Sequence, residues 1–456
     1  MRRIRVISAN SCNKIIRIIQ KDNHIPIGRY RWTICGLVFF ATTINYLDRS
    51  VISLLKPFLE IEFSWKETDY SHIVISFQVA YAVGLIGVGR FIDKVGTKTG
   101  YALSTLVWSI AAMGHALAKG TFGFGVARAA LGISEAGNFP AAIKTIAEWF
   151  PKKERAFATG IFNSGTNIGA IATPLTVPWI AVHLGWQWAF ILTGAVGFIW
   201  LILWFIIYEI PSKHKRLSPE EYIYIHSDQD DIDTINQFGD NDTKISWASL
   251  LRLKQTWAFV AGKFLTDPVW WFYLFWLPAF LKAQYDINGT GLALPIALVY
   301  TMAGFGSVAG GWLPLYLIRK GWPLVKARKT SMLIYALCVI PVVFAQWLGA
   351  LNMWFAVLII GLAASAHQAW SANIFTTVSD MFPKRVVGSV TGIGGMAGAI
   401  GGILIAWLAG VLFEYYKSVG KIEIGYYIMF FICGGAYIVA WLTMHILTPT
   451  MRKTGS

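Results

Sequence analysis

The sequence predicts an all-α polytopic membrane protein, with twelve transmembrane helices in two pseudo-symmetric six-helix bundles, and three observations support this. Hydrophobic residues make up 55% of the 456 residues and charged residues only 14%, more apolar sequence than a soluble core needs. The apolar residues fall in runs of about 20 or more, enough to cross a bilayer as a helix. A sequence pattern from the first half also returns in the second half.

Twelve apolar runs give the expected helices in order. They are 32–58, 70–92, 99–118, 121–149, 155–182, 186–208, 255–283, 290–318, 326–348, 352–380, 385–413 and 424–447. The connections are short except for one rich in Asp, Lys and Ser, which indicates a linker between two halves. The expected divisions are an N-terminal extension 1–27, a first bundle 28–208, a linker 209–254, a second bundle 255–448 and a tail 449–456.

Most of the 39 Lys and Arg residues lie in the N-terminal extension, the even-numbered connections and the tail. Because basic residues stay on the cytoplasmic side, we expect both termini in the cytoplasm. The net charge of +15 then reflects topology, so we expect lipid around the chain and no nucleic-acid partner. The extension lacks the apolar core of a signal peptide.

Other protein classes lack support in the sequence. The eight His and four Cys residues are dispersed without ligand spacing, so we expect no metal, no cofactor and no enzymatic centre. A sugar-sensing receptor would need a sizeable soluble output domain, and the longest polar connection is too short for one.

An internal repeat supports two related halves. The segment 148–152, EWFPK, returns as 380–384, DMFPK. The glycines that follow keep the same offset, Gly160 with Gly392 and Gly169 with Gly401. Small residues at such spacing allow helices to approach closely.

The segment 89–98, GRFIDKVGTK, resembles the cytoplasmic signature of the major facilitator superfamily. Its expected gating residues are Gly89, Asp93, Gly96 and Lys98. Asp93 is expected to cap a neighbouring helix and to pair with a basic residue across the two halves, which would lock one face closed. The equivalent loop 311–329 lacks the aspartate, so we do not expect a matched second lock.

Within that superfamily, helices one and four resemble the anion:cation symporter family. The resemblance rests on 45–49 (NYLDR), Arg128 and 134–140 (SEAGNFP), and 31–35, 55–57 and 162–167 are similar to bacterial hexuronate (galacturonate or glucuronate) transporters. It implies import of a sugar-acid anion across a bacterial inner membrane by proton symport with alternating access, and we expect a monomer. The open alternatives are another organic anion, such as an aldonate or aldarate, and an uncoupled or sodium-coupled carrier.

The residues themselves point to anion transport. Asp48 and Arg49 lie in the middle of an apolar helix, where each charge costs roughly 2.5–3.5 kcal/mol, so they should face partners or water inside the bundle. Arg128 and Glu135 are seven residues apart and share one helix face. An arginine fork suits a substrate carboxylate, and a carboxyl group in a partly dry cavity can carry a proton.

Each charged residue has a predicted role and an alternative. Arg49 is the expected anchor for the substrate carboxylate, with pairing to Asp48 or Glu135 as the alternative. Arg128 is the expected ion partner of Asp48. Glu135 is the expected proton carrier, and Asp48 is either a second protonation site or a fixed counter-ion.

Neutral polar groups complete the predicted cavity, since they can bind the hydroxyls of a sugar acid. Beside Arg49, the expected substrate-binding residues are Tyr46, Tyr81, Asn163, Asn167, His367, Gln368, Trp370 and Ser371. Each could instead form a hydrogen bond between helices. Lys263 and Asp267, four residues apart on helix seven, are expected to neutralise each other.

Overall fold

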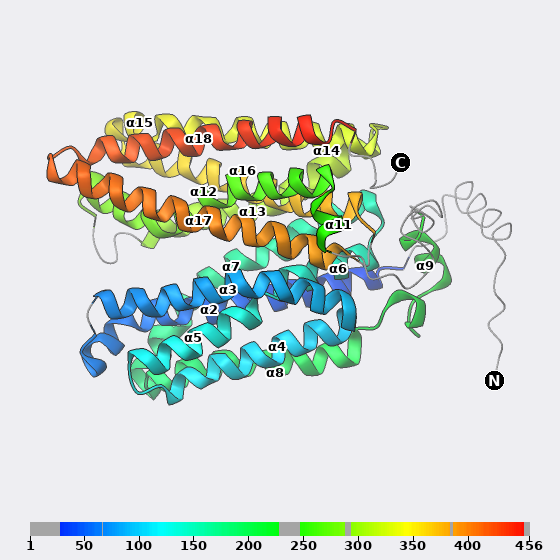
Figure 1. Cartoon of the computed structure of the whole chain (residues 1–456), viewed down its shortest axis with the longest axis horizontal. Helices are drawn as coiled ribbons and strands as arrows, with labels where there is room; N and C mark the ends of the chain where they lie inside the picture. The colour runs from blue at the N-terminus through cyan, green and yellow to red at the C-terminus, as the bar shows by residue number, and fades with distance from the viewer. Residues whose placement is uncertain (1–27, 66, 228–246, 288–292, 384–385, 451–456) are drawn as a thin grey trace.

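The computed structural model describes residues 28–65, 67–227, 247–287, 293–383 and 386–450, and within these ranges all regular elements are helices. Two bundles lie side by side (Figure 1). The first contains α2 (Tyr30–Phe63), α3 (Glu67–Val95), α4 (Thr97–Gly114), η1 (His115–Leu117), α5 (Thr121–Glu135), α6 (Asn138–Trp149), α7 (Lys152–Leu184) and α8 (Trp186–Ile207). The second contains α12 (Lys254–Tyr285), α13 (Ala293–Arg319), α14 (Leu324–Val339), η4 (Ile340–Phe344), α15 (Ala345–Leu351), α16 (Met353–Met381), α17 (Val387–Ser418) and α18 (Ile422–Leu447).

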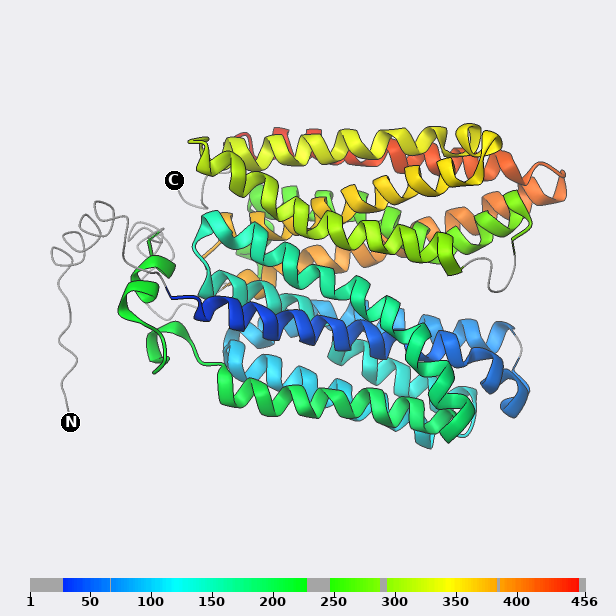
Figure 2. The same cartoon turned by 180° about the vertical axis from the view of Figure 1, so that it is seen from behind.

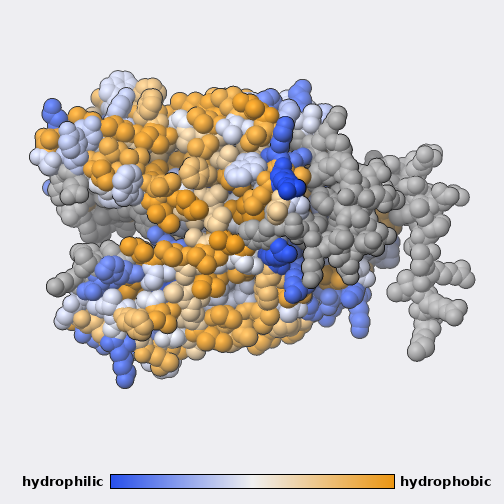
Figure 3. Space-filling model, in the orientation of Figure 1, coloured by the Kyte–Doolittle hydropathy of each residue, from blue (hydrophilic) through white to orange (hydrophobic). Residues whose placement is uncertain are grey.

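These helices form twelve membrane-length rods in the described ranges, because α5 continues into α6 and α14 continues through η4 into α15. Eight rods are long and apolar enough to cross a membrane by composition alone. Hydrophobic residues cover much of the side of both bundles in the view of Figure 3. Helices α2, α5 and α12 are not among the eight, and they carry the charged pairs described below.

The helix predicted over 121–149 is divided in the structure. Helix α5 ends at Glu135 and α6 begins at Asn138. Proline has no N–H to donate, so Pro140 cannot form the helical bond to the Ala136 carbonyl. The break therefore falls directly after Glu135. A 3₁₀ segment with a proline, η4, likewise interrupts the helix predicted over 326–348.

One pair of the repeated glycines, Gly160 and Gly392, makes equivalent contacts between the bundles. A Cβ added at Gly160 of α7 would lie 2.3 Å from the Ser307 carbonyl oxygen of α13. A Cβ added at Gly392 of α17 would lie 2.3 Å from the Leu85 carbonyl oxygen of α3. Figure 2 shows α7 and α13 running along the junction of the bundles from behind. Helices of the two bundles touch backbone to backbone at these positions, as the repeat indicated.

The described part of the connection between the bundles contains the short helices η2 (Pro211–Lys213), α9 (Pro219–Ile225) and α11 (Trp247–Leu251). The end of the molecule where α9 and the start of α2 lie is called the α9 end below (Figure 1). Glu221 of α9 accepts hydrogen bonds from the backbone N–H groups of Tyr30 and Arg31, each at 3.1 Å. A carboxylate there satisfies unpaired donors at a helix start. The extension 1–27 and most of the tail lie outside the described residues.

Candidate functional site

The predicted binding residues surround two connected spaces between the bundles. The smaller, of about 80 Å³, is lined by Tyr46, Arg49, Tyr81, Asn163, Thr166, Lys263, Asp267, Trp270, Trp271, His367, Gln368, Ser371 and Thr391, among others. The larger, of about 460 Å³, shares Tyr46, Arg49, Thr166, Trp270 and Trp271 with it. Residues of α3 nearer its start line the larger space, so the cavity widens away from the α9 end, where α3 finishes.

Arg49 of α2 faces the cavity with a carboxylate beside it. Its Nε lies 2.9 Å from Glu135 Oε2, and the Glu135 side chain is fully buried whereas 13% of the Arg49 side chain is exposed. The rings of Tyr46 and Tyr81 lie 4.7 and 4.8 Å from the guanidinium carbon. Glu135 Oε1 is buried without a hydrogen-bond partner among the described residues. The guanidinium is therefore the cavity-facing member of a buried ion pair.

The expected pairing of Asp48 with Arg128 does not occur in this conformation. Arg128 donates a hydrogen bond to the Arg49 carbonyl at 3.0 Å. Asp48 is buried, and neither of its carboxylate oxygens has a hydrogen-bond partner among the described residues. The reason is geometric, since the Arg128 side chain reaches the α2 backbone one residue beyond Asp48.

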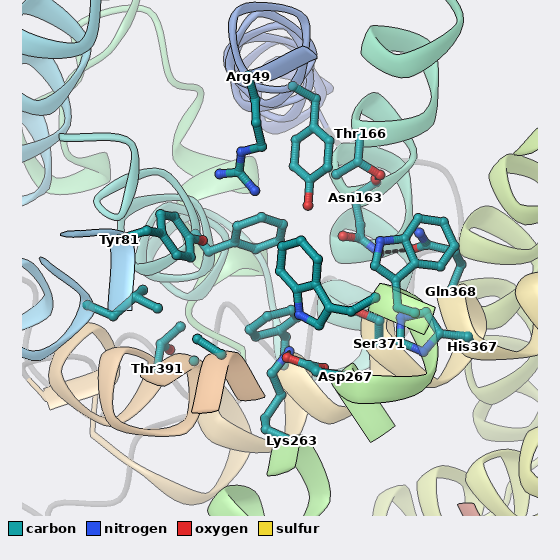
Figure 4. A pocket seen from close by; sticks show the side chains of 18 residues that line it. Arg49, Tyr81, Asn163, Thr166, Lys263, Asp267, His367, Gln368, Ser371 and Thr391 are labelled. Carbon is teal, nitrogen blue, oxygen red and sulfur yellow. Dashed lines mark hydrogen bonds and ion pairs between the residues drawn. The ribbon is translucent and has the colours of Figure 1, made fainter. Parts of the chain in front are cut away.

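Polar side chains join the two bundles beside the smaller space. Asn163 of α7 donates to Gln368 of α16 at 2.7 Å and to Ser307 of α13 at 3.3 Å. His367 of α16 is hydrogen-bonded to Tyr437 and stacks on Trp270 with ring centres 5.1 Å apart. Figure 4 shows Asn163, Gln368, His367 and Ser371 on one side of the pocket. The structure thus brings together these predicted residues from both halves.

Two predicted residues do not line the smaller space. Asn167 lines only the larger space, and its amide nitrogen and oxygen are buried without partners among the described residues. Trp370 does not line either space, because its ring is buried and packs edge-on against Tyr437 at 5.5 Å. Among the lining residues that the sequence did not indicate is Thr391, whose hydroxyl is also unpartnered in the described part of the chain.

The gating segment contacts the other bundle at the α9 end. Asp93 accepts hydrogen bonds from the Gly388 N–H at 3.2 Å and from the Ser389 N–H and hydroxyl at 2.7 and 2.6 Å. These donors belong to the start of α17, where a helix dipole favours an anion. The basic partner of Asp93 is Lys144, at 2.9 Å. Lys144 belongs to the same bundle, so the ion pair does not cross between halves as the resemblance implied.

The remaining gating residues shape the turn after α3. Gly96 has φ of 87°, a value that residues with a side chain rarely adopt. Lys98 donates to Glu209 at 2.9 Å, and this hydrogen bond lowers the pKa of the Glu209 carboxyl. Lys98 therefore ties the start of α4 to the segment just after α8 in the same half.

A second contact between the halves forms where none was expected. Asp380, at the end of α16, pairs with Arg328 at 2.9 Å and lies 3.8 Å from Arg155 of the first bundle. Arg328 also donates to the Lys152 carbonyl at 2.8 Å. The aspartate missing from the loop after α13 is replaced by one from the repeated segment 380–384. Among the described residues, two polar clusters therefore join the halves at the α9 end.

A family model, Major Facilitator Superfamily, matches residues 38–406. The chain belongs to this superfamily. It is 34% identical over 385 residues to the hexuronate transporter of Escherichia coli strain K12, covering 84% of this chain and 86% of the relative. It is also 34% identical to the galacturonate transporter of Dickeya chrysanthemi, covering 68% of this chain and 89% of the relative.

A solved structure of a superfamily member has the same fold. The proton:xylose symporter XylE, bound to 6-bromo-6-deoxy-D-glucose, superposes with a TM-score of 0.75 at 17% identity and covers 93% of this chain and 98% of its own. The present chain is therefore a multi-pass membrane transporter, similar in sequence to hexuronate transporters, and not an enzyme.

Proposed function

We propose that this transporter imports a hexuronate, such as galacturonate or glucuronate, by proton symport with alternating access. The observation that carries the proposal is the Arg49–Glu135 ion pair at the cavity wall. It presents a guanidinium that can bind a carboxylate bidentately and places a protonatable group directly against it. The names of the two relatives, a hexuronate and a galacturonate transporter, support the choice of substrate.

In the proposed cycle, a proton and the substrate arrive from the open side. Protonation of Glu135 ends its charge pairing with Arg49, and the substrate carboxylate takes its place. Asn163 and Gln368, one from each half, bind substrate hydroxyls, as do Asn167 and Ser371. The two bundles then close around the substrate and their contacts at the α9 end separate. The site thereby becomes exposed to the other side of the membrane.

The same proposal includes the topology. We propose that the α9 end faces the cytoplasm of a bacterium, with both termini there, because the basic connections meet at that end. The two bundles 28–208 and 255–448 would move as units about the linker 209–254. Asp48 would serve as a second protonation site, with Arg128 as its ion partner in another conformation. The transporter would work as a monomer surrounded by lipid.

Coupling the uptake of the anion to the uptake of protons has an electrical advantage. Moving an anion against an inside-negative potential costs about 2.3 kcal/mol per charge per 100 mV. One proton carried with a monovalent acid cancels this cost, and two protons make the potential drive uptake.

The test is uptake of labelled galacturonate by proteoliposomes containing the purified transporter. An imposed pH gradient, acidic on the open side, should drive accumulation above the external concentration, whereas a sodium gradient at uniform pH should not. Accumulation with sodium alone would replace the proton as the driving ion. Equilibration without accumulation under either gradient would indicate an uncoupled carrier, and no uptake at all would exclude the substrate class tested.

A further inference from the structure

A second buried ion pair lies in the cavity wall of the other bundle. Lys263 Nζ and Asp267 Oδ2, both on α12, are 2.7 Å apart. Both residues line the smaller space, and in Figure 4 they lie across the pocket from Arg49. The transport cycle proposed above gives this pair no role. Both charges lie where the far end of a substrate bound to Arg49 would lie.

The pair is held in place by its neighbours. A Cβ added at Gly398 of α17 would lie 2.1 Å from Asp267 Oδ2, so the absence of a side chain there makes room for the carboxylate. Lys263 Nζ lies 4.2 Å above the ring of Phe375, a favourable position for a cation. Only 6% of the Lys263 side chain and 19% of the Asp267 side chain are exposed. Asp267 is therefore the more accessible member.

Among the described residues, the cavity thus has an ion pair on each of two opposite walls, and the two pairs differ in which charge is the more exposed. At the first, the guanidinium of Arg49 is more exposed than the carboxylate of Glu135. At the second, the carboxylate of Asp267 is more exposed than the ammonium of Lys263. The third cation of the lining, Arg128, donates to the Arg49 carbonyl and belongs to the same bundle as Arg49. A ligand anchored on Arg49 and extended across the cavity would meet Asp267.

We propose that Asp267, held by Lys263, restricts the transporter to sugar acids with a single carboxylate, and that it accepts hydrogen bonds from hydroxyls at the far end of the substrate. This rests on the proposed function, because Arg49 must hold the first carboxylate. A hydroxyl donates readily to a carboxylate. A second carboxylate at that end would meet like charge, which is an effective means of rejecting a competing ligand.

Galacturonate, galactonate and galactarate test this directly. Galactarate is galacturonate with its aldehyde end oxidised to a second carboxylate, and galactonate is an open-chain acid with one carboxylate. In counterflow of labelled galacturonate by wild-type transporter in proteoliposomes, unlabelled galactonate should compete within about tenfold of galacturonate. Galactarate should compete on the order of 100-fold more weakly than galactonate, because like charges oppose it.

Two variants separate charge from shape. Asp267→Asn leaves Lys263 able to pair with a second carboxylate, so galactarate should gain on the order of tenfold or more relative to galactonate. The double variant Lys263→Gln with Asp267→Asn removes both charges, so the second carboxylate meets no cation and galactarate should gain much less. Size-exclusion profile and thermal unfolding in detergent report whether each variant folds.

The outcomes are distinct. If wild type does not exchange galacturonate at all, the proposed function fails. If it exchanges galacturonate but galactarate competes as well as galactonate, only the role of Asp267 is refuted, and this comparison needs no variant. Equal gains for galactarate in the single and double variants would also refute the part assigned to Lys263. Rejection of galactonate together with galactarate would show that ring shape, and not charge, selects the substrate.

Discussion

Gly89 provides a direct test of how the α9 end closes. In the structure, a Cβ added at Gly89 of α3 would lie 2.3 Å from the Gly388 carbonyl oxygen and 2.9 Å from the Gly388 carbonyl carbon. Both atoms are backbone, so they cannot rotate away as a side chain could. Gly89→Ala should therefore force the bundles apart at this end. Gly87, two residues earlier on the same helix, has nothing within 4 Å of its added Cβ and supplies the matched control.

The size of the effect follows from the contact. Overpacking a well-packed interface costs about 1–3 kcal/mol, and only the closed α9 end bears that cost. Because 1.4 kcal/mol corresponds to a tenfold change in an equilibrium constant, the ratio of molecules with an open α9 end to those with a closed one should rise roughly 5- to 150-fold. Replacing glycine by alanine in a helix stabilises it by about 1 kcal/mol at either position. Gly87→Ala therefore shares the gain in helix stability without the clash.

The assay measures the distance between spin labels on the two bundles. Cysteines introduced at Thr99 and Lys320, both exposed at the α9 end, would carry the labels in a background without the native cysteines. Gly89→Ala should shift the distance distribution toward longer separations, and Gly87→Ala should match the unsubstituted background. Identical distributions for the two variants would refute the close approach of α3 and α17 as the reason for the glycine.

Three further substitutions test other contacts. Arg49→Lys keeps the charge but not the planar fork of the guanidinium, so galacturonate binding should weaken by about 2–4 kcal/mol. The exposed control Arg216→Lys should leave the affinity unchanged. Unchanged affinity in Arg49→Lys itself would remove Arg49 from the anchor role. Asp93→Asn weakens the charge-assisted hydrogen bonds to the start of α17, so thiol labelling of cysteines introduced at the α9 end should increase. Unaltered labelling would show that Asp93 does not hold this end closed. Glu221→Ala leaves the first N–H groups of α2 without their acceptor. The thermal unfolding midpoint in detergent should therefore fall by an amount corresponding to about 1–3 kcal/mol. An unchanged midpoint would show that α9 does not stabilise α2.

The charged members of the cavity could be predicted from sequence because charge inside an apolar helix is costly and stands out. Arg49, Glu135 and the Lys263–Asp267 pair all face the cavity or lie directly behind it. Their partners were harder to predict. Which basic residue reaches Asp48 or Asp93 depends on how neighbouring helices are rotated, and helical periodicity within one segment does not report that rotation.

Helix α16 shows the same limit for neutral residues. From Ala363 to Ser379 it is buried on nearly all sides, so the pattern there has no exposed side from which to infer the cavity-facing one. The sequence therefore predicts Trp370 in the cavity, whereas Trp270 of α12 and Thr391 of α17 line it. The docking of α9 on α2 and the bridge through Asp380 join residues far apart in sequence, and no local pattern indicates such contacts.

Glu135→Gln tests the central claim, that the carboxyl beside Arg49 carries the coupling proton. The amide resembles the protonated acid permanently and leaves Arg49 able to bind the substrate carboxylate. Exchange of internal for external galacturonate needs no proton release, so it should persist in the variant, whereas accumulation driven by a pH gradient should be lost. Glu423→Gln, which removes an exposed carboxylate outside the cavity, should retain both activities. If Glu135→Gln accumulates galacturonate in response to a pH gradient as well as wild type does, Glu135 is not the proton carrier and the account of coupling is wrong.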